Sequence, residues 1–309
     1  MAITQPPAAA TLDLTGDRRR RRRERRVRSA FFGAAAISVL ISVAIVVALV
    51  GEAGSFLRSI EISALWADGW FPRRGRFSIM AILVHTLMVS GIAMLVAIPF
   101  GLGSAIYLSE YARPSVRRVL KPTLEILAGI PSVVLGFFAL QFITPNIVRG
   151  LFPGAQSANF LAAGIGVGIL IVPLIASVSE DAMRAVPKAL REASYGLGAK
   201  RWHTALRIVF PAAISGIVAA VILGVSRAIG ETMVVALAAG LNGIMTFNPT
   251  EGGLTMTGAM ANLAVGSDQV AGDVAAFQSL FFLGLVLFVL TLILNIFSER
   301  IVRRLRQRY

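Results

Sequence analysis

Cysteine is absent from the 309 residues of this chain. Without it the chain forms no disulfide, uses no thiolate nucleophile, and holds no zinc ion or iron–sulfur cluster through sulfur. The Walker A pattern of P-loop ATPases is also missing, so this chain does not itself bind ATP through such a loop. Gly164, Gly166 and Gly168 resemble a dinucleotide loop only superficially, because they lie within an apolar run and no strand precedes them. We expect close helix packing there instead.

Charge is scarce as well. Only 15% of the residues are charged, whereas 56% are apolar even before the 29 glycines are counted. A soluble domain of this size needs more polar residues than that to cover its surface. The composition therefore excludes a soluble protein and predicts a membrane protein.

Long apolar runs are abundant, and a span needs about 20 such residues. We predict an all-α, polytopic fold with six transmembrane helices. Their expected residues are 30–50, 79–108, 123–148, 160–178, 212–240 and 276–298. The first run is longer than the apolar region of a signal peptide, so we interpret it as a retained helix.

Lys and Arg outnumber Asp and Glu by 30 to 16, and they are unevenly placed. Cytoplasmic loops of membrane proteins carry the excess of Lys and Arg. The four richest segments would all lie on one side, which predicts that both termini are cytoplasmic. These segments are residues 18–28, 113–121, 184–207 and 300–308.

The chain divides into four expected parts. Residues 1–29 are predicted to be a disordered Arg-rich tail that binds anionic lipid rather than nucleic acid, because it adjoins a span. Residues 30–78 would hold the first span and an external loop, and 79–298 the transmembrane core. Residues 299–309 would form a basic cytoplasmic tail. Segment 241–275 is expected outside the cell, with a pair of short helices.

No enzyme active site or metal site is evident. The 2 histidines, His85 and His203, fall in a predicted span and a predicted loop, so they would not share a site, and we expect structural roles for them. Glu180 and Asp181 lie near a helix end, where we expect a solvated or capping role. We predict that the chain is not an enzyme and carries no cofactor.

The loop at residues 179–211 is the most informative segment. A short amphipathic helix is predicted over residues 188–197, with a glycine turn after it and a second helix before a proline. Its key residues lie at fixed offsets: Glu192, Ala193, Ser194, Gly198, Ile208, Phe210 and Pro211. This spacing resembles the EAA loop of binding-protein-dependent ABC importer permeases, with Ser and Phe as mild departures.

That resemblance implies the type I permease fold of ABC importers. In that family the loop contains a coupling helix that sits in a cleft of the ATPase subunit. The residues that would position this contact are Glu192, Ala193, Gly198, Ile208 and Pro211.

A narrower resemblance comes from other segments. Residues 107–112, 128–134, 179–182 and 227–233 look like the phosphate-specific (Pst) permeases. Met-Val-Val after Gly230-Glu231-Thr232 is more similar to the PstC-type subunit than to PstA. The resemblance covers residues 79–309.

The resemblance implies one permease subunit of an ATP-driven phosphate importer in the bacterial plasma membrane. Its partners would be a PstA-like permease, two PstB-like ATPases that bind ATP and Mg²⁺, and an extracytoplasmic PstS-like binding protein. Three alternatives remain open: a PstA-type subunit, a sulfate or molybdate permease, and a secondary transporter or channel. The last is disfavoured because we find no inverted internal repeat.

Arg227 lies in the fifth predicted span, four residues before Glu231. An arginine in mid-span is costly, and on a continuous helix these two side chains would share one face. A structural account makes them an internal ion pair. A functional account has Arg227 bind phosphate oxygens while Glu231 orients the guanidinium. We expect Arg227, Glu231 and Thr232 to line the substrate path.

Overall fold

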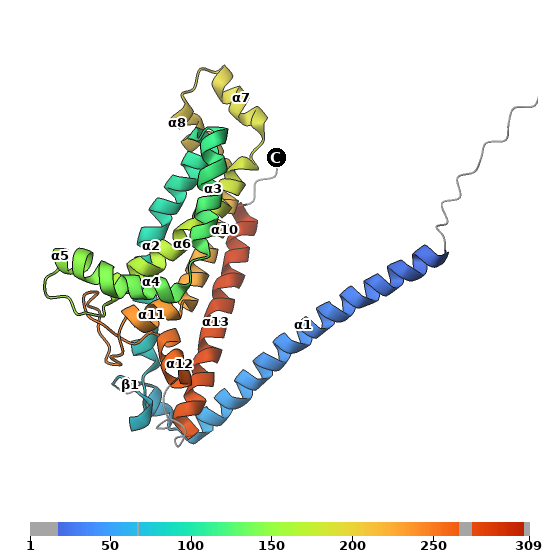
Figure 1. Ribbon diagram of the computed structural model, residues 1–309. Coiled ribbons are helices and arrows are strands. Elements are labelled where there is room, and N and C mark those ends of the chain that lie inside the picture. Colours follow the sequence, from blue (N-terminus) through green and yellow to red (C-terminus); the bar gives the residue numbers. More distant parts are fainter. Residues whose placement is uncertain (1–17, 67, 266–273, 306–309) are drawn as a thin grey trace, which may run out of the picture. The chain divides into compact units, whose positions relative to one another are not determined.

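The computed structural model describes residues 18–66, 68–265 and 274–305. Helices dominate these ranges (Figure 1), and the chain divides into two compact units, residues 1–49 and 50–309. The first unit holds most of α1 (Arg18–Ser59), whose apolar part is long enough to span a bilayer. The prediction of disorder is wrong for residues 18–29, because arginine favours helix and no proline or glycine interrupts the run. Residues 1–17 lie outside the described part.

The second unit begins with the last turns of α1. Ala53 and Phe56 are buried there, in an apolar cluster that also holds Phe77 and Phe282. Between α1 and the next long helix lie only short elements: η1 (Ile62–Trp66), β1 (Trp70–Phe71), η2 (Pro72–Arg74) and β2 (Arg76–Phe77). The two strands pair antiparallel, with Trp70 opposite Phe77.

Two long helices form the centre of the second unit. They are α2 (Ile79–Ile106), extended by the π-helix η3 (Tyr107–Tyr111), and α6 (Phe160–Arg184). A Cβ added at Gly164 would lie 2.6 Å from the Cβ of Ile92, and one at Gly168 would lie 2.8 Å from that of Val96. The glycines let the two helices touch, which confirms the packing role predicted for them.

The third predicted span, residues 123–148, is wrong in its bounds. The chain forms α3 (Pro114–Ala128), breaks at Gly129–Pro131, and resumes as α4 (Ser132–Phe138), the π-helix η4 (Ala139–Val148) and α5 (Arg149–Leu151). Pro131 lacks an N–H and disfavours a helical residue before it, so the helix stops there. The apolar segment long enough to span is Ser132–Leu151.

The segment after α6 is a series of shorter helices. They are α7 (Lys188–Gly196), α8 (Arg201–Thr204), η5 (Ala205–Val209), α9 (Phe210–Ala212), α10 (Ile214–Gly230) and α11 (Met233–Ala238). The axis bends by 73° between residues 201–212 and 214–230. The fifth predicted span, residues 212–240, is not one continuous helix. Helix α10 ends at Gly230, and α11 begins at Met233.

The chain closes with α12 (Met256–Val265) and α13 (Val274–Leu305). The predicted pair of short helices in 241–275 is represented by α12, and residues 266–273 lie outside the described part. The expected basic tail from residue 299 continues α13 as helix through Leu305. Residues 306–309 also lie outside the described part.

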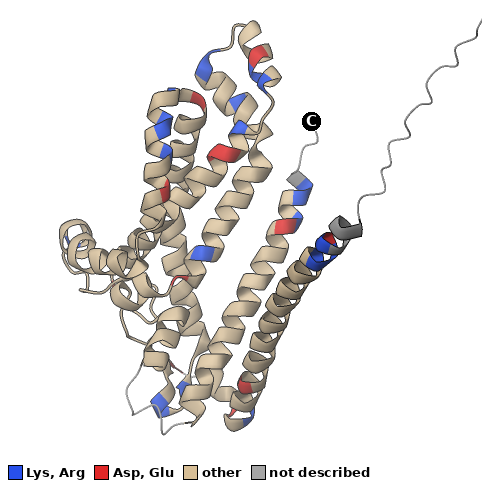
Figure 2. Ribbon diagram, turned by 45° about the vertical axis from the view of Figure 1, so that its right-hand side comes forward, with Lys and Arg blue, Asp and Glu red and all other residues tan. Residues whose placement is uncertain are grey.

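In the described residues, five helices are long and apolar enough to cross a membrane, or up to six if the bent pair counts as one span. The prediction of six spans agrees with the higher number. Lys and Arg gather at the end of the second unit that carries α7 and α8, and a smaller group lies at the opposite end (Figure 2).

Candidate functional site

Helix α7 ends where the sequence predicts. Gly198 has φ +76°, a left-handed conformation that glycine adopts at low cost. Its N–H donates to the carbonyl of Tyr195 at 2.9 Å, and the N–H of Ala199 donates to that of Ser194 at 3.1 Å. These two bonds form a Schellman motif, which confirms the predicted glycine turn and reverses the chain sharply into α8.

The far side of α7 is open. Glu192 and Ala193 are exposed, and Leu197 has 90% of its surface accessible. Ala193, Gly198 and Ile208 line one hollow of about 670 Å³ with Trp202. Exposed apolar side chains beside a hollow form a surface suited to docking a partner protein.

The remaining predicted loop residues are distributed around this surface. Glu192 lines a second hollow, of about 350 Å³, together with Arg184 and Lys188. Pro211 lies in the first turn of α9 and belongs to neither hollow. The Oγ of Ser194 and the Oγ1 of Thr204 are 2.8 Å apart, which joins α7 to α8.

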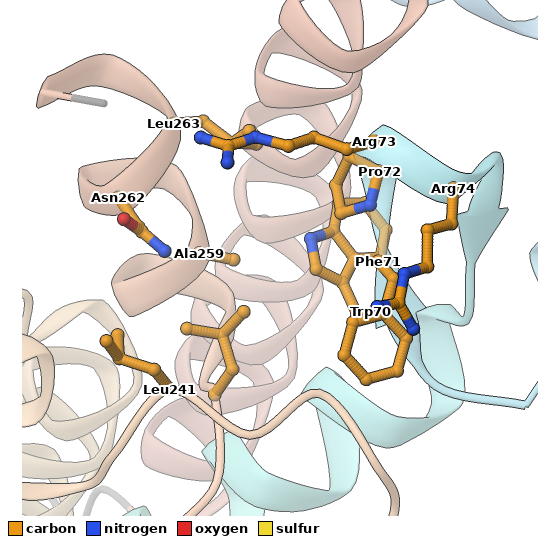
Figure 3. Close-up of a pocket in the computed structure, with 10 residues that line it drawn as sticks. Trp70, Phe71, Pro72, Arg73, Arg74, Leu241, Ala259, Asn262 and Leu263 are labelled. Atoms are coloured by element: carbon orange, nitrogen blue, oxygen red, sulfur yellow. The ribbon is translucent and has the colours of Figure 1, made fainter. Parts of the chain in front are cut away.

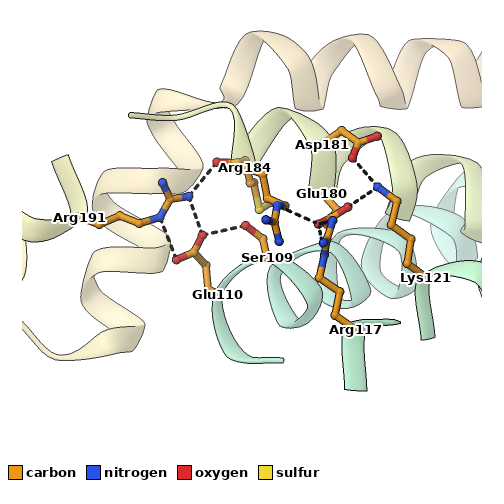
Figure 4. Close-up of polar contacts among 9 residues, drawn as sticks. Ser109, Glu110, Arg117, Lys121, Glu180, Asp181, Arg184 and Arg191 are labelled. Atoms are coloured by element: carbon orange, nitrogen blue, oxygen red, sulfur yellow. Dashed lines mark hydrogen bonds and ion pairs between the residues drawn. The ribbon is translucent and has the colours of Figure 1, made fainter. Parts of the chain in front are cut away.

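On its inner side α7 is tied to the long helices. Arg191 extends from α7 to Glu110 of η3 (Figure 4), with Nη2 to Oε1 at 2.9 Å. The same guanidinium donates to the carbonyls of Val186 and Met183, each at 2.8 Å. The Oγ of Ser109 donates to Glu110 as well, at 2.8 Å.

The expectation for Glu180 is wrong, because its side chain is fully buried rather than solvated. Arg117 bonds to it at 2.8 Å and Lys121 at 2.7 Å, and Arg184 lies 3.7 Å away. Lys121 also pairs with Asp181, which is exposed. A buried carboxylate is tolerated only when it is paired in this way, and the ion pairs hold α3 against α6.

This arrangement affects the titration of Lys121. Partial burial of the ammonium acts to lower its pKa, but the hydrogen bonds to Asp181 and Glu180 and their charges outweigh that effect and raise the pKa above its ordinary value of 10.5. Lys121 therefore stays charged throughout the physiological range.

The predicted ion pair between Arg227 and Glu231 is not formed. Helix α10 ends at Gly230, and Glu231 takes an extended conformation with ψ 129°. Its Oε1 accepts instead from the backbone N–H groups of Met233 and Val234, at 3.2 and 3.4 Å, and so caps the start of α11. A spacing of four residues places side chains together only on a continuous helix, and the helix breaks between these two.

Arg227 is exposed and makes no ion pair or hydrogen bond with any residue that the structure describes. Thr232 lies in the break between α10 and α11, where its Oγ1 donates to the carbonyl of Gly230 at 3.3 Å. The Oγ1 of Thr257 in α12 donates to the carbonyl of Glu231 at 2.6 Å. Hydrogen bonds from Thr232 and Thr257 thus fix the backbone at the break. The N–H donors of Arg227 remain without a partner among the described residues.

Helix α4 lies against α11. A Cβ added at Gly136 would lie 3.0 Å from the carbonyl oxygen of Met233 and 3.0 Å from the Cα of Val234. The interruption before Ser132 and the interruption at Glu231 therefore precede two short helices that touch. Irregular backbone at membrane depth is tolerated only inside protein or beside a water-filled cavity, and the contact between α4 and α11 places both interruptions next to packed protein.

The opposite end of the second unit is built around η2 and the segment before α12. A hollow of about 370 Å³ is lined by Trp70, Arg73, Leu241 and Asn262, among others (Figure 3). His85 of α2 is buried and bonds to the segment before α12. Its Nδ1 lies 3.0 Å from the carbonyl oxygen of Leu254, and its Nε2 accepts from the N–H of Thr246 at 3.3 Å. The structural role predicted for His85 is consistent with both bonds.

Sequence reasoning overlooked Arg191, Glu110, Arg117 and Lys121. The three basic side chains bond to Glu110 or Glu180, and the sequence did draw attention to the segments that hold both carboxylates. Glu110 and Glu180 lie in the segments 107–112 and 179–182 that resemble the Pst permeases. Gly230 immediately before Glu231 was also a sign that the helix could end there.

The helical bundle and its apolar spans define the class: a multi-pass membrane protein. The comparisons with known proteins specify it further. Residues 97–307 match the family described as the binding-protein-dependent transport system inner membrane component. The chain belongs to this family.

Individual relatives agree. The chain is 31% identical to a phosphate transport system permease protein PstC of Mesorhizobium japonicum, over 89% of each chain. It is 34% identical to a probable ABC transporter permease protein, YqgH, of Bacillus subtilis, over 79% of this chain and 80% of that one.

Among solved structures, a bacterial ABC transporter involved in the import of alginate superposes with a TM-score of 0.64 at 16% identity, covering 93% of this chain and 100% of that one. This likeness confirms the all-α permease fold of ABC importers.

Proposed function

We propose that this chain is the PstC-type permease subunit of an ATP-driven importer of inorganic phosphate and forms half of the translocation pathway. The observation that carries the proposal is the exposed α7 loop, which has EAA spacing and the predicted left-handed glycine. Relatives that are phosphate permeases, matched over most of the chain, support phosphate as the substrate.

In this function α7 is the coupling helix. Its open surface, with Glu192, Ala193 and Leu197, faces the cleft of the ATPase. Gly198 sets the turn, Ile208 lines the adjoining hollow, and Pro211 begins the helix that returns to the membrane. The ATPase binds ATP and Mg²⁺, and this chain contributes no cofactor and no catalysis of its own.

Arg227, with Glu231 and Thr232, serves the substrate path. Phosphate costs too much to place in hydrocarbon, so protein must supply cationic donors along its route. The planar fork of Arg227 matches phosphate oxygens, and no described side chain competes for it. Glu231 acts through the break that it caps rather than through an ion pair with Arg227.

Uptake must be driven. Moving an anion into a negative-inside cell opposes the membrane potential by about 2.3 kcal/mol per charge per 100 mV. The proposed partners supply the energy of ATP hydrolysis and deliver the phosphate. They are a PstA-like permease, two PstB-like ATPases and a PstS-like binding protein outside.

We place the chain in the bacterial plasma membrane with both termini cytoplasmic, its basic ends near anionic lipid, and no nucleic acid bound.

Uptake of radiolabelled phosphate in a strain lacking this gene tests the substrate. Re-expression of the chain should restore uptake, and excess sulfate should not compete. Competition by sulfate or molybdate, with weak phosphate uptake, would instead favour a permease for another oxyanion.

The absence of cysteine makes orientation directly testable. Phe247→Cys lies in the predicted external segment and Leu197→Cys in the predicted cytoplasmic loop, and both side chains are well exposed. An impermeant thiol reagent should label residue 247 in intact cells and residue 197 only after permeabilisation. The reverse pattern would overturn the orientation and the coupling role together.

A further inference from the structure

Arg191 joins more segments than any other side chain of α7. Its Nε and Nη2 reach the two carboxylate oxygens of Glu110 at 3.4 and 2.9 Å. The remaining bonds go to the carbonyls of Met183, at the end of α6, and Val186, in the turn before α7. One guanidinium thus connects α7 with the ends of both α2 and α6 (Figure 4).

The contact lies mostly out of water. The side chain of Glu110 is 4% exposed and that of Arg191 is 17% exposed. Charge-assisted hydrogen bonds with a guanidinium are strong and directional, and removal of one partner leaves the other charge buried and unpaired. Breaking this contact therefore costs more free energy than breaking a surface ion pair.

In the described part of the chain, no other polar contact duplicates it. Leu190 in α7 makes an apolar contact beside it and packs against the cluster that holds Ala105 of α2 and Met183 of α6. Within the same described residues, every hydrogen bond from α7 to the ends of α2 and α6 is donated by Arg191. Ser194 links α7 to α8 instead, and the Glu180 ion pairs link α3 to α6 without touching α7.

Helices α2 and α6 are packed closely enough to move together if α7 moves. Their backbones approach closely at Gly101, Gly164 and Gly168, where an added Cβ would lie 2.8 Å or less from a side-chain carbon of the other helix. Packed elements of this kind move together rather than deform.

We propose, on the basis of the function proposed above, that the Arg191–Glu110 contact is the mechanical link that passes movement of the coupling helix to α2 and α6. Arg191 is a positioning residue in this scheme: it acts through Glu110 and touches neither ATP nor phosphate. Loss of the link should leave the ATPase docked and active while transport falls behind hydrolysis.

The test uses the complete importer in proteoliposomes, with Glu110→Gln, Arg191→Lys and the double variant. Glutamine keeps the shape of Glu110 without its charge. Lysine keeps the charge of Arg191, but its single ammonium does not reach both carboxylate oxygens and both carbonyls. The measured quantity is phosphate imported per ATP hydrolysed, beside co-purification of the ATPase. We expect this ratio to fall about threefold to thirtyfold in each single variant, with no further fall in the double variant.

Arg207→Gln is the matched control, because Arg207 is exposed on the same loop and has no described polar partner. It removes one positive charge and should leave the ratio unchanged. A wild-type ratio in Glu110→Gln, or additive losses in the double variant, would overturn the link.

A second measurement separates this inference from the proposed function. Amide hydrogen exchange over residues 188–196 should accelerate in Glu110→Gln, while exchange in the glycine-packed part of α6 stays as in the wild type. Unchanged exchange in α7 would refute the link even if phosphate uptake is normal. A wild-type importer that carries no phosphate would refute the proposed function, and the exchange result would still decide the link.

Discussion

The two candidate sites treat their charges in opposite ways. At the α7 end, Glu110 and Glu180 are buried and each is bonded to arginine or lysine. In the membrane segment, Arg227 is exposed, and the carboxylate of Glu231 accepts hydrogen bonds from backbone N–H groups. Paired charges hold helices together, whereas an unpaired cation in a span is costly and marks a candidate functional site. The contrast supports the mechanical coupling proposed for the first region and the substrate contact proposed for the second.

The largest expected effect comes from Arg227→Lys. It keeps the charge but loses the bidentate fork, so phosphate uptake should fall about tenfold to a hundredfold. Subunit assembly should remain normal, as judged by co-purification of the partners. Arg118→Lys is a control at an exposed arginine of α3 with no described partner. Wild-type uptake by Arg227→Lys would remove the contrast, since Arg227 would then not contact the substrate.

Gly198→Val is the next in size. Space is available, because an added Cβ would meet nothing within 4 Å, so the penalty is conformational: about 1–2 kcal/mol or more for a non-glycine residue in the left-handed region. We expect transport to fall about fivefold to thirtyfold while the permease still inserts. Gly198→Asn is the matched variant, because asparagine tolerates this region and should retain most activity. Equal activity in both variants would mean that the turn does not position the coupling surface.

Gly168→Ala should act on stability. The new Cβ would lie 2.8 Å from the Cβ of Val96, so α2 and α6 must separate, at about 1–3 kcal/mol. Thermal unfolding in detergent should show a lower midpoint. Gly103→Ala is the control on α2, since nothing lies within 4 Å of that position. An unchanged midpoint in Gly168→Ala would contradict the close packing of α2 against α6 at this position.

The smallest effect concerns pH. Because the folded pKa of Lys121 is raised, its ion pairs contribute their full stability below its ordinary pKa of 10.5 and lose it as pH rises further. The unfolding midpoint of the wild type, relative to Lys121→Met, should therefore fall above pH 10.5 and stay level between pH 6 and 9. A difference that changes across pH 6 to 9 would point to another titrating group.

Much of the architecture could be predicted from local patterns. Apolar runs of span length, clustered cations and the spacing from Glu192 to Pro211 lie within short stretches of chain. Their physical causes, solvation and helix termination, act over a few residues. The membrane class, the loop helix and its left-handed Gly198 were therefore predictable.

The tertiary structure alone decided which charges meet. Glu110 and Arg191 are 81 residues apart, and Glu180 lies 63 residues from Arg117. No periodicity selects such partners, because they depend on how α2, α3 and α6 pack. The separation of Arg227 from Glu231 likewise followed from a helix that ends at Gly230. Hydrophobicity and local conformational preference determined the elements of this protein, and packing between distant segments determined which charges are bound and which stay available.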